Sequence, residues 1–114
     1  MINITVIIPV FNEEGNIGSL LRKIKSINKL NLEIIVVNDG SSDNTLDEAK
    51  KYDCKIISLT ENMGKGFAMR EGIKNANGYY TLFLGGDGQD DPKEILSLYK
   101  KIKNGYDLVI GSRF

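Results

Sequence analysis

LEIIVVNDGSSDNTLDEAKKY, residues 32–52, decides the fold class of this chain. Its first part, Leu32–Val37, is an apolar run rich in β-branched side chains, which predicts a strand buried on both faces. A polar loop follows, and SSDNTLDEAKKY predicts a helix with Ser42 or Asp43 as its N-cap. A buried strand that leads through a short loop into a helix is the building unit of a parallel α/β sheet.

The same unit recurs along the chain. Further strands are predicted at Ile4–Val10, Lys55–Leu59, Tyr79–Leu84 and Asp107–Gly111. Helical spacing of apolar residues predicts helices after the first three of these strands. Their inner faces are, in chain order, Ile17, Leu20, Leu21, Ile24 and Ile27, then Ala68, Met69, Gly72, Ile73 and Ala76, and last Ile95, Leu98, Tyr99 and Ile102. We therefore expect one domain, residues 1–114, with a three-layer α/β/α Rossmann-like architecture and about five mainly parallel strands.

Local signals also predict how two of these helices begin. Asn12 is a candidate N-cap of the first helix, with two acidic residues, Glu13 and Glu14, in its first turn. Asp91 and Pro92 have the residue types expected at the start of the last helix.

Composition excludes several function classes. The 114 residues carry 15 basic and 15 acidic side chains, so no overall charge favours a nucleic-acid partner. The absence of histidine removes histidine acid/base chemistry, serine–histidine triads and most zinc sites. The single cysteine, Cys54, is predicted to lie in the core or at a strand edge. One thiol cannot form an internal disulfide, which is consistent with a reducing compartment, so we expect a cytoplasmic protein. No apolar run approaches the ~20 residues of a membrane span, and the N-terminus is a poor signal peptide.

Polar residues follow every predicted strand, which is where parallel sheets bind their ligands. These residues are Asn12, Glu13, Asn38, Asp39, Ser41, Ser42, Asp43, Asn62, Lys65, Asp87, Gln89, Asp90, Asp91 and Arg113. Asp39 and Asp87 come directly after apolar strands, where partial desolvation strengthens the interaction of a carboxylate with a cation. The first strand–helix turn contains no glycine up to Glu13, and NMGKG lacks P-loop spacing. A dinucleotide-binding turn and a P-loop are therefore not expected.

Four ordered segments resemble family 2 glycosyltransferases of the GT-A fold. They are IIPVFNEEGNI, EIIVVNDGSSDNT, ENMGKGFAMREGIKNANGYYTLFLGGDGQDDPKEI and DLVIGSRF, which together cover essentially the whole chain. Within this family, the segments most resemble the dolichol-phosphate mannose synthase and polyprenyl-phosphate glycosyltransferase type. The resemblance implies a nucleotide-diphosphate sugar as donor, of the UDP, GDP or dTDP type, and Mg²⁺ or Mn²⁺ as cofactor.

The resemblance also implies roles for individual residues. Pro9, Phe11 and Glu13 are expected to line the base and ribose, and Asp39 to accept a hydrogen bond from the base. Asp87 and Gln89 are expected to bind the metal beside the diphosphate. Arg113 is expected to contact the phosphates, and Lys65 is a second candidate for positive charge at the same place.

The sequence departs from the family pattern in two places. Alignment on QDDP puts Gly85 where the family usually has the first aspartate of D-x-D, so the free metal is expected to bind poorly. The family domain also continues beyond GSRF with the acceptor surface and the general base, so the chain is expected to be truncated. No catalytic base is assigned, because Asp90 is better interpreted as a loop acid beside a helix start.

We therefore expect the donor-binding part of an inverting glycosyltransferase that acts on a lipid-phosphate or glycan acceptor, at the inner face of the membrane if the acceptor is a lipid. The alternative is a catalytically inactive nucleotide-binding or partner-binding module with the same fold. A receiver or flavodoxin-like domain is disfavoured because SLTENMG provides no aspartate after the third strand. A homodimer that buries apolar surface left without its usual cover is a further hypothesis.

Overall fold

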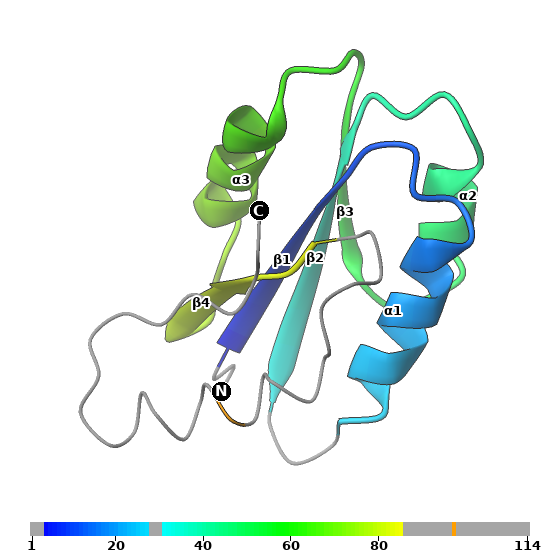
Figure 1. Cartoon of the computed structure of the whole chain (residues 1–114). Coiled ribbons are helices and arrows are strands. Elements are labelled where there is room, and N and C mark those ends of the chain that lie inside the picture. Colours follow the sequence, from blue (N-terminus) through cyan, green and yellow to red (C-terminus); the bar gives the residue numbers. More distant parts are fainter. Residues whose placement is uncertain (1–3, 28–30, 86–96, 98–114) are drawn as a thin grey trace.

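The computed structural model describes residues 4–27, 31–85 and 97. Its described strands are β1 (Ile4–Val10), β2 (Leu32–Asp39), β3 (Lys55–Leu59) and β4 (Tyr80–Phe83), all parallel and ordered β3-β2-β1-β4 (Figure 1). The predicted bounds of β1 and β3 are confirmed. β2 extends two residues further than predicted, and β4 is one residue shorter at each end. Of the predicted last helix the structure describes only Ser97, which is helical, and the predicted strand Asp107–Gly111 lies outside the described residues.

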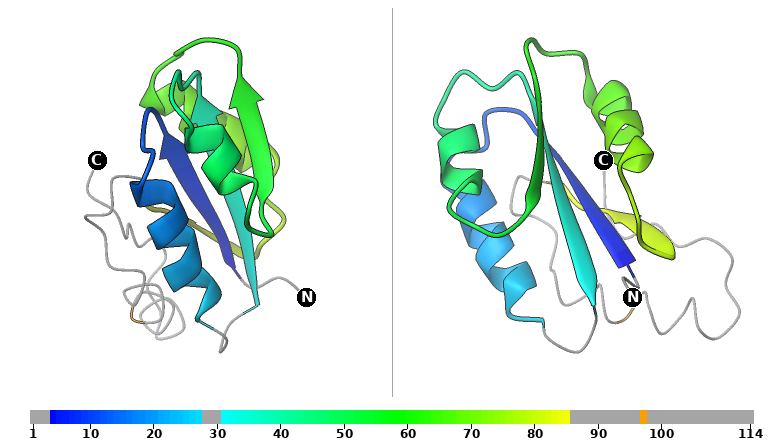
Figure 2. Two further views of the ribbon diagram at one scale, coloured as in Figure 1. Left: turned by 90° about the vertical axis from the view of Figure 1, so that its right-hand side faces the viewer. Right: turned by 180° about the vertical axis from the view of Figure 1, so that it is seen from behind.

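Helices cover both faces of the sheet. α1 (Asn16–Lys25) and α2 (Thr45–Ala49) lie side by side on one face, and α3 (Lys65–Lys74) lies on the other (Figures 1 and 2). This arrangement confirms the three-layer α/β/α prediction for the described part of the chain. None of the helices described there has the length and apolar character needed to cross a membrane.

The larger core lies between the sheet and α1. Even-numbered residues of β1, from Ile4 to Val10, pack with the apolar stripe of α1 because alternate side chains of a strand point to the same face. The predicted inner face of α1 is confirmed at Ile17, Leu20, Leu21 and Ile24, which are all buried, while Ile27 is partly buried. Cys54 is half-buried against the same core, and burial raises the pKa of its thiol.

The smaller core lies under α3 and depends on small residues. Ala68 packs with Ile7, Ile35 and Val37, and a Cβ added at Gly72 would lie only 2.5 Å from Cγ2 of Ile7. Ala68 and Gly72 are one helical turn apart, so together they let the backbone of α3 approach β1 closely. The face of α3 that contacts the sheet is therefore narrow. The prediction of a wider inner face for this helix is wrong in part.

Two residues predicted to be buried on this side are exposed. Ile73 is 52% exposed and Tyr79 is 79% exposed. Ile73 directly follows Gly72, and successive helical residues point about 100° apart, so the close approach at Gly72 turns Ile73 off the contact face. Tyr79 precedes β4 instead of belonging to it, so it is not held in the sheet.

A polar cluster ties the amino ends of the strands together. The carboxylate of Glu33 accepts hydrogen bonds from Thr5 Oγ1 at 2.7 Å and from the backbone and side-chain nitrogens of Asn77 at 2.8 and 2.9 Å. Nζ of Lys55 lies 3.5 Å away. Burial opposes the ionisation of Glu33, but the hydrogen bonds from Asn77 and Thr5 and the charge of Lys55 outweigh it and lower its pKa to about 2. This cluster lies at the edge of the sheet opposite the predicted ligand site.

Candidate functional site

The loops after β1 and β2 bond to each other at the carboxyl edge of the sheet. The backbone nitrogen of Asn12 donates to Ser41 Oγ at 3.0 Å, and Asn12 Oδ1 accepts from the backbone nitrogen of Ser42 at 2.9 Å. Asn12 has a φ of 52°, a left-handed conformation that asparagine tolerates better than most residues. Its prediction as the N-cap of α1 is therefore wrong, because its side chain is used by the neighbouring loop.

The two acids after Asn12 continue this exchange. The backbone nitrogen of Glu13 donates to Thr45 Oγ1 at 2.9 Å, and Glu14 Oε1 accepts from the backbone nitrogen of Asn44 at 3.0 Å. Both acids precede α1, which has no acidic residue in its first turn, so the predicted interaction with its helix dipole is not observed. The two loops thus hold each other through bonds in both directions.

Asp43 organises the start of α2 from the position before the N-cap, Asn44. Its carboxylate accepts from the hydroxyl of Thr45, from the backbone nitrogen of Thr45 at 3.0 Å and from that of Glu14 at 3.3 Å. The hydroxyl of Thr45 contributes most to lowering the pKa of Asp43; the backbone bonds add to this and partial desolvation opposes it. The prediction of Ser42 or Asp43 as the N-cap is therefore wrong, because the N-cap is Asn44, although Asp43 does accept a hydrogen bond from the first helical amide.

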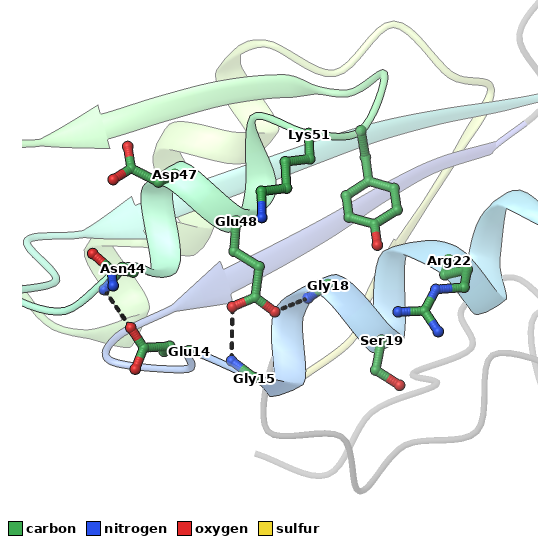
Figure 3. A pocket seen from close by; sticks show the side chains of 10 residues that line it. Glu14, Gly15, Gly18, Ser19, Arg22, Asn44, Asp47, Glu48 and Lys51 are labelled. Atoms are coloured by element: carbon green, nitrogen blue, oxygen red, sulfur yellow. Dashed lines mark hydrogen bonds between the residues drawn. The ribbon is translucent and has the colours of Figure 1, made fainter.

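Glu48 caps α1 from the neighbouring helix. Its Oε2 accepts from the backbone nitrogen of Gly15 at 2.7 Å, and its Oε1 accepts from that of Gly18 at 2.9 Å (Figure 3). Gly15 is the N-cap of α1 and has no side chain that could bond to the first-turn amides. The carboxylate of Glu48 therefore satisfies donors that a local cap would otherwise serve.

Asp39 fixes the loop between β3 and α3. It is buried at the end of β2, and its Oδ1 accepts from the backbone nitrogen of Met63 at 2.7 Å while its Oδ2 accepts from that of Gly64 at 3.0 Å. The side-chain nitrogen of Asn62 donates to the backbone oxygen of Asp39 at 3.4 Å. A carboxylate has about four acceptor positions, so Asp39 retains capacity for a further donor.

Five predicted site residues lie at this edge, in different environments. Pro9 is buried in β1, where the pairing with β4 ends two residues before it, at Ile7. Phe11 is 46% exposed just beyond β1, and Glu13 is half-buried. Lys65 is exposed as the first residue of α3. With Asp39, these residues bring apolar, acidic and basic groups to the strand ends.

The remaining predicted residues are outside the described part of the chain. They are Asp87, Gln89, Asp90, Asp91 and Arg113. Gly85 is described and half-buried; it follows Leu84, whose backbone nitrogen donates to the oxygen of Ile7 at 3.0 Å. This bond extends the pairing of β4 with β1 beyond Phe83 and brings Gly85 toward the carboxyl edge.

The described residues alone do not form a metal site. Across residues 4–27, 31–85 and 97, no three side chains of the histidine, cysteine, aspartate or glutamate type are grouped so that they could hold a metal ion. A fit to a divalent cation therefore depends on Asp87 and Gln89, whose side-chain oxygens are the donors that Mg²⁺ and Mn²⁺ prefer.

Two residues that take part in these contacts, Glu48 and Met63, were not singled out from the sequence. Glu48 gave no signal because the residues it contacts are 30 and 33 positions away in the chain. Met63 had one available signal, an apolar residue between Asn62 and Gly64 in an otherwise polar loop. Its side chain is 45% exposed at the same edge as Phe11.

A groove of about 590 Å³ lies between α1 and α2, next to the bonded loops. Arg22, Asp47 and Lys51 line it together with Glu48 (Figure 3). Among the described residues, none of those predicted to bind the donor lines this groove. The strand ends, and not this groove, therefore remain the candidate site.

Known proteins resemble this chain along nearly its whole length. The sequence profile of Glycosyl transferase family 2 matches residues 5–114. A dolichol-phosphate mannosyltransferase of Pyrococcus furiosus is 39% identical over 97% of this chain and 33% of its own length. A dodecaprenyl-phosphate galacturonate synthase of Rhizobium johnstonii is 34% identical over 98% of this chain and 36% of its own length. The chain thus spans about a third of these two curated relatives.

Solved structures share the architecture. The glucosyl-3-phosphoglycerate synthase of Mycobacterium tuberculosis in complex with UDP superposes with a TM-score of 0.78 and 25% identity, over 90% of this chain and 40% of that one. The same enzyme with Mn²⁺, UDP and phosphoglyceric acid gives a TM-score of 0.80 at 24% identity, over 93% and 40% of the two chains. Both have the predicted GT-A fold, which is thereby confirmed for this chain.

Proposed function

Because the chain belongs to glycosyl transferase family 2, we propose that it binds a nucleotide-diphosphate sugar as the donor-binding part of an inverting glycosyltransferase. The observation that carries this proposal is the gathering of Phe11, Glu13, Asp39 and Lys65 at the carboxyl ends of adjacent parallel strands. Ligands of open α/β sheets bind at that edge. The UDP complex of the solved relative supports the choice of a nucleotide as ligand.

Each described residue has a chemical task in this proposal. Phe11 offers an exposed aromatic face for a base, and Glu13 offers carboxylate oxygens for ribose hydroxyls. Asp39, already holding two amides, accepts a further hydrogen bond from a ring N–H of the base. Lys65, exposed at the start of α3, adds positive charge near the diphosphate.

The diphosphate end depends on three residues outside the described part. Asp87 and Gln89 would hold Mg²⁺ or Mn²⁺, and Arg113 would pair with phosphate oxygens through its planar guanidinium. When bound, the cation offsets the charge that accumulates on the departing diphosphate. Gly85 contributes no side-chain oxygen, so we expect the metal to bind tightly only together with the nucleotide.

The acceptor is proposed from the relatives. Both curated relatives are named for transfers that involve a polyisoprenoid phosphate, which supports a lipid-phosphate acceptor for the protein. Such an acceptor would bring the reaction to a membrane surface. The homodimer expected from the sequence remains a prediction, which sedimentation would test.

A thermal-shift titration with UDP, GDP and dTDP, each with and without Mn²⁺, tests the proposal. A ligand at ~100 times its Kd adds ~2.7 kcal/mol to stability, which is readily detected in a small domain. We expect one nucleotide to raise the Tm, more so with Mn²⁺, and Asp87→Ala to remove the Mn²⁺-dependent part. Asp53→Asn, an exposed aspartate with a 3.9 Å ion pair to Lys25, serves as the control. The absence of a shift with every nucleotide would contradict the proposal.

Gly85 favours a second candidate, a nucleotide-binding module without turnover. The two candidates differ in one measurement, the release of nucleoside diphosphate from a sugar nucleotide with polyprenyl phosphate present. Binding with turnover supports the transferase, and binding without turnover supports the inactive module.

A further inference from the structure

Asp39 controls the shape of the loop that precedes α3. Both of its oxygens accept backbone hydrogen bonds, at 2.7 Å from Met63 and 3.0 Å from Gly64, and the carboxylate is buried. Bonds to an ionised acceptor with so little water around it are strong. The backbone of Met63 therefore has a defined position relative to the end of β2.

The loop is also held from its other side. A Cβ added at Gly40 would lie 2.4 Å from the carbonyl carbon of Glu61 and 2.5 Å from the nitrogen of Asn62, so the turn after β2 lies directly on this loop. Although its backbone is held so closely, the side chain of Met63 is 45% exposed. An apolar side chain on a fixed backbone is thus presented to solvent, against the tendency of methionine to be buried.

Met63 has a counterpart across the end of β2. Phe11, 46% exposed, follows β1, and β2 lies between β1 and β3 in the sheet. The other large exposed apolar side chains described are Ile73, in the last turn of α3, and Tyr79, which follows that helix. Both are within four residues of Asn75, whose oxygen is 3.3 Å from Nζ of Lys55 at the start of β3. The ligand edge therefore presents two apolar side chains with a buried carboxylate between them in strand order.

This combination suits a nucleobase. A planar heterocycle has two apolar faces, which favour aromatic and thioether contacts, and a polar rim, which requires a hydrogen-bond partner. We propose that Met63 contacts the nucleobase of the donor and determines affinity for it, and that Asp39 is the residue that positions Met63. The inference rests on the proposed function and assigns to its site a residue that the sequence did not indicate.

The first test separates base contact from phosphate contact. Calorimetric titration with UDP, GDP and dTDP in the presence of Mn²⁺ identifies the preferred nucleotide of the wild-type protein. Met63→Ala should weaken that nucleotide about tenfold, which corresponds to about 1.4 kcal/mol, and leave the binding of inorganic pyrophosphate with Mn²⁺ unchanged. Met63→Leu should restore the affinity to within about twofold, because leucine replaces most of the apolar contact. Ile73→Ala, a similarly exposed side chain at the far end of α3, should have no effect on either ligand.

The second test is a double-mutant cycle. Asp39→Asn lowers the affinity for the nucleotide by some factor in each background. If Asp39 acts through Met63, this factor should be at least about threefold smaller in the Met63→Ala background than in the wild-type background. Hydrogen exchange without nucleotide should show faster exchange of the amides of Met63 and Gly64 in Asp39→Asn.

The outcomes distinguish this inference from the proposed function. If the wild-type protein binds none of the nucleotides, both fail. If the wild-type protein binds one nucleotide, two results refute the nucleobase contact while the proposed function stands. One is that Met63→Ala binds this nucleotide equally well, and the other is that its affinity for pyrophosphate falls by the same factor as its affinity for the nucleotide. If the effects of Asp39→Asn and Met63→Ala add, Asp39 does not position Met63. Because Met63 is exposed, its variants test the contact even if Asp39→Asn fails to fold.

Discussion

Replacing Glu48 with alanine should destabilise the protein far more than replacing its neighbour Asp47. Glu48→Ala removes the acceptor of the N-cap amide of α1, Gly15, at 2.7 Å, and of one first-turn amide, Gly18, at 2.9 Å. Loss of an N-cap typically costs ~1 kcal/mol, and bonds to charged acceptors are worth more than neutral ones, but Glu48 is only half-buried and water replaces part of the loss. We expect a destabilisation of about 2 kcal/mol.

Asp47 provides a matched control. Both acids are in the first turn of α2, so each variant loses the same favourable interaction with the dipole of that helix, worth about 0.5 kcal/mol. Only Glu48 reaches the amides of α1. The difference between the two variants, about 1.5 kcal/mol, therefore measures the capping of one helix by another. Glu48→Gln retains one acceptor oxygen and should fall between them.

Urea unfolding and differential scanning calorimetry would measure these differences. For a domain of this size, 1 kcal/mol corresponds to about 4 °C, so Tm should fall by about 8 °C for Glu48→Ala and about 2 °C for Asp47→Ala. Hydrogen exchange should localise the loss to the amides of Gly15 and Gly18. Equal Tm values for the two variants would refute the reasoning, because they would mean that water serves these amides as well as the carboxylate does.

Three further predictions concern other parts of the fold. The pKa of Glu33 is lowered from 4.5 to about 2, so the unfolded chain binds more protons between these values, and the stabilisation, complete above about pH 4.5, is lost as the pH falls toward 2. Screening by solvent reduces this contribution to about 1–2 kcal/mol, and Glu33→Gln should remove that part of the pH dependence; parallel urea-midpoint curves from pH 2 to 6 would contradict it. Gly72→Ala places a Cβ 2.5 Å from Ile7 Cγ2 and should cost about 1–3 kcal/mol in urea unfolding, an expectation that fails if its midpoint equals that of the wild-type protein. Gly85→Asp adds a carboxylate before Asp87 and should tighten Mn²⁺ binding in calorimetric titration at least about threefold, whereas unchanged binding would show that position 85 is not near the cation.

The strands were predictable because their signal is local. The apolar β-branched runs at Ile4–Val10 and Lys55–Leu59 end at polar residues, and the structure ends β1 and β3 at the same places. The buried stripe of α1 followed equally from its own spacing. These elements depend on burial alone, which a short window of sequence encodes.

The helix starts and the site geometry were less predictable because they depend on distant partners. Asn12 has the residue type of a cap, yet its oxygen is bonded to Ser42, and the cap of α1 comes from Glu48. Asp39 was correctly placed at a strand end, but its bonds to Met63 and Gly64 span 24 and 25 positions. No local window contains both partners of such contacts. Whether Asp87, Gln89 and Arg113 complete the site stays a prediction.

The sheet order has a consequence for the time course of folding. β1 is an interior strand of the described sheet although it precedes the other described strands in the chain, and its second neighbour is β4. The hydrogen bond from the nitrogen of Gly78 to Thr5 Oγ1 joins residues 73 positions apart. Contacts of such long range close slowly, because the entropy of a large loop is lost before the contact forms. During synthesis β1 therefore keeps an unpaired apolar edge until β4 has left the ribosome, and unpaired edges of this kind are prone to aggregation.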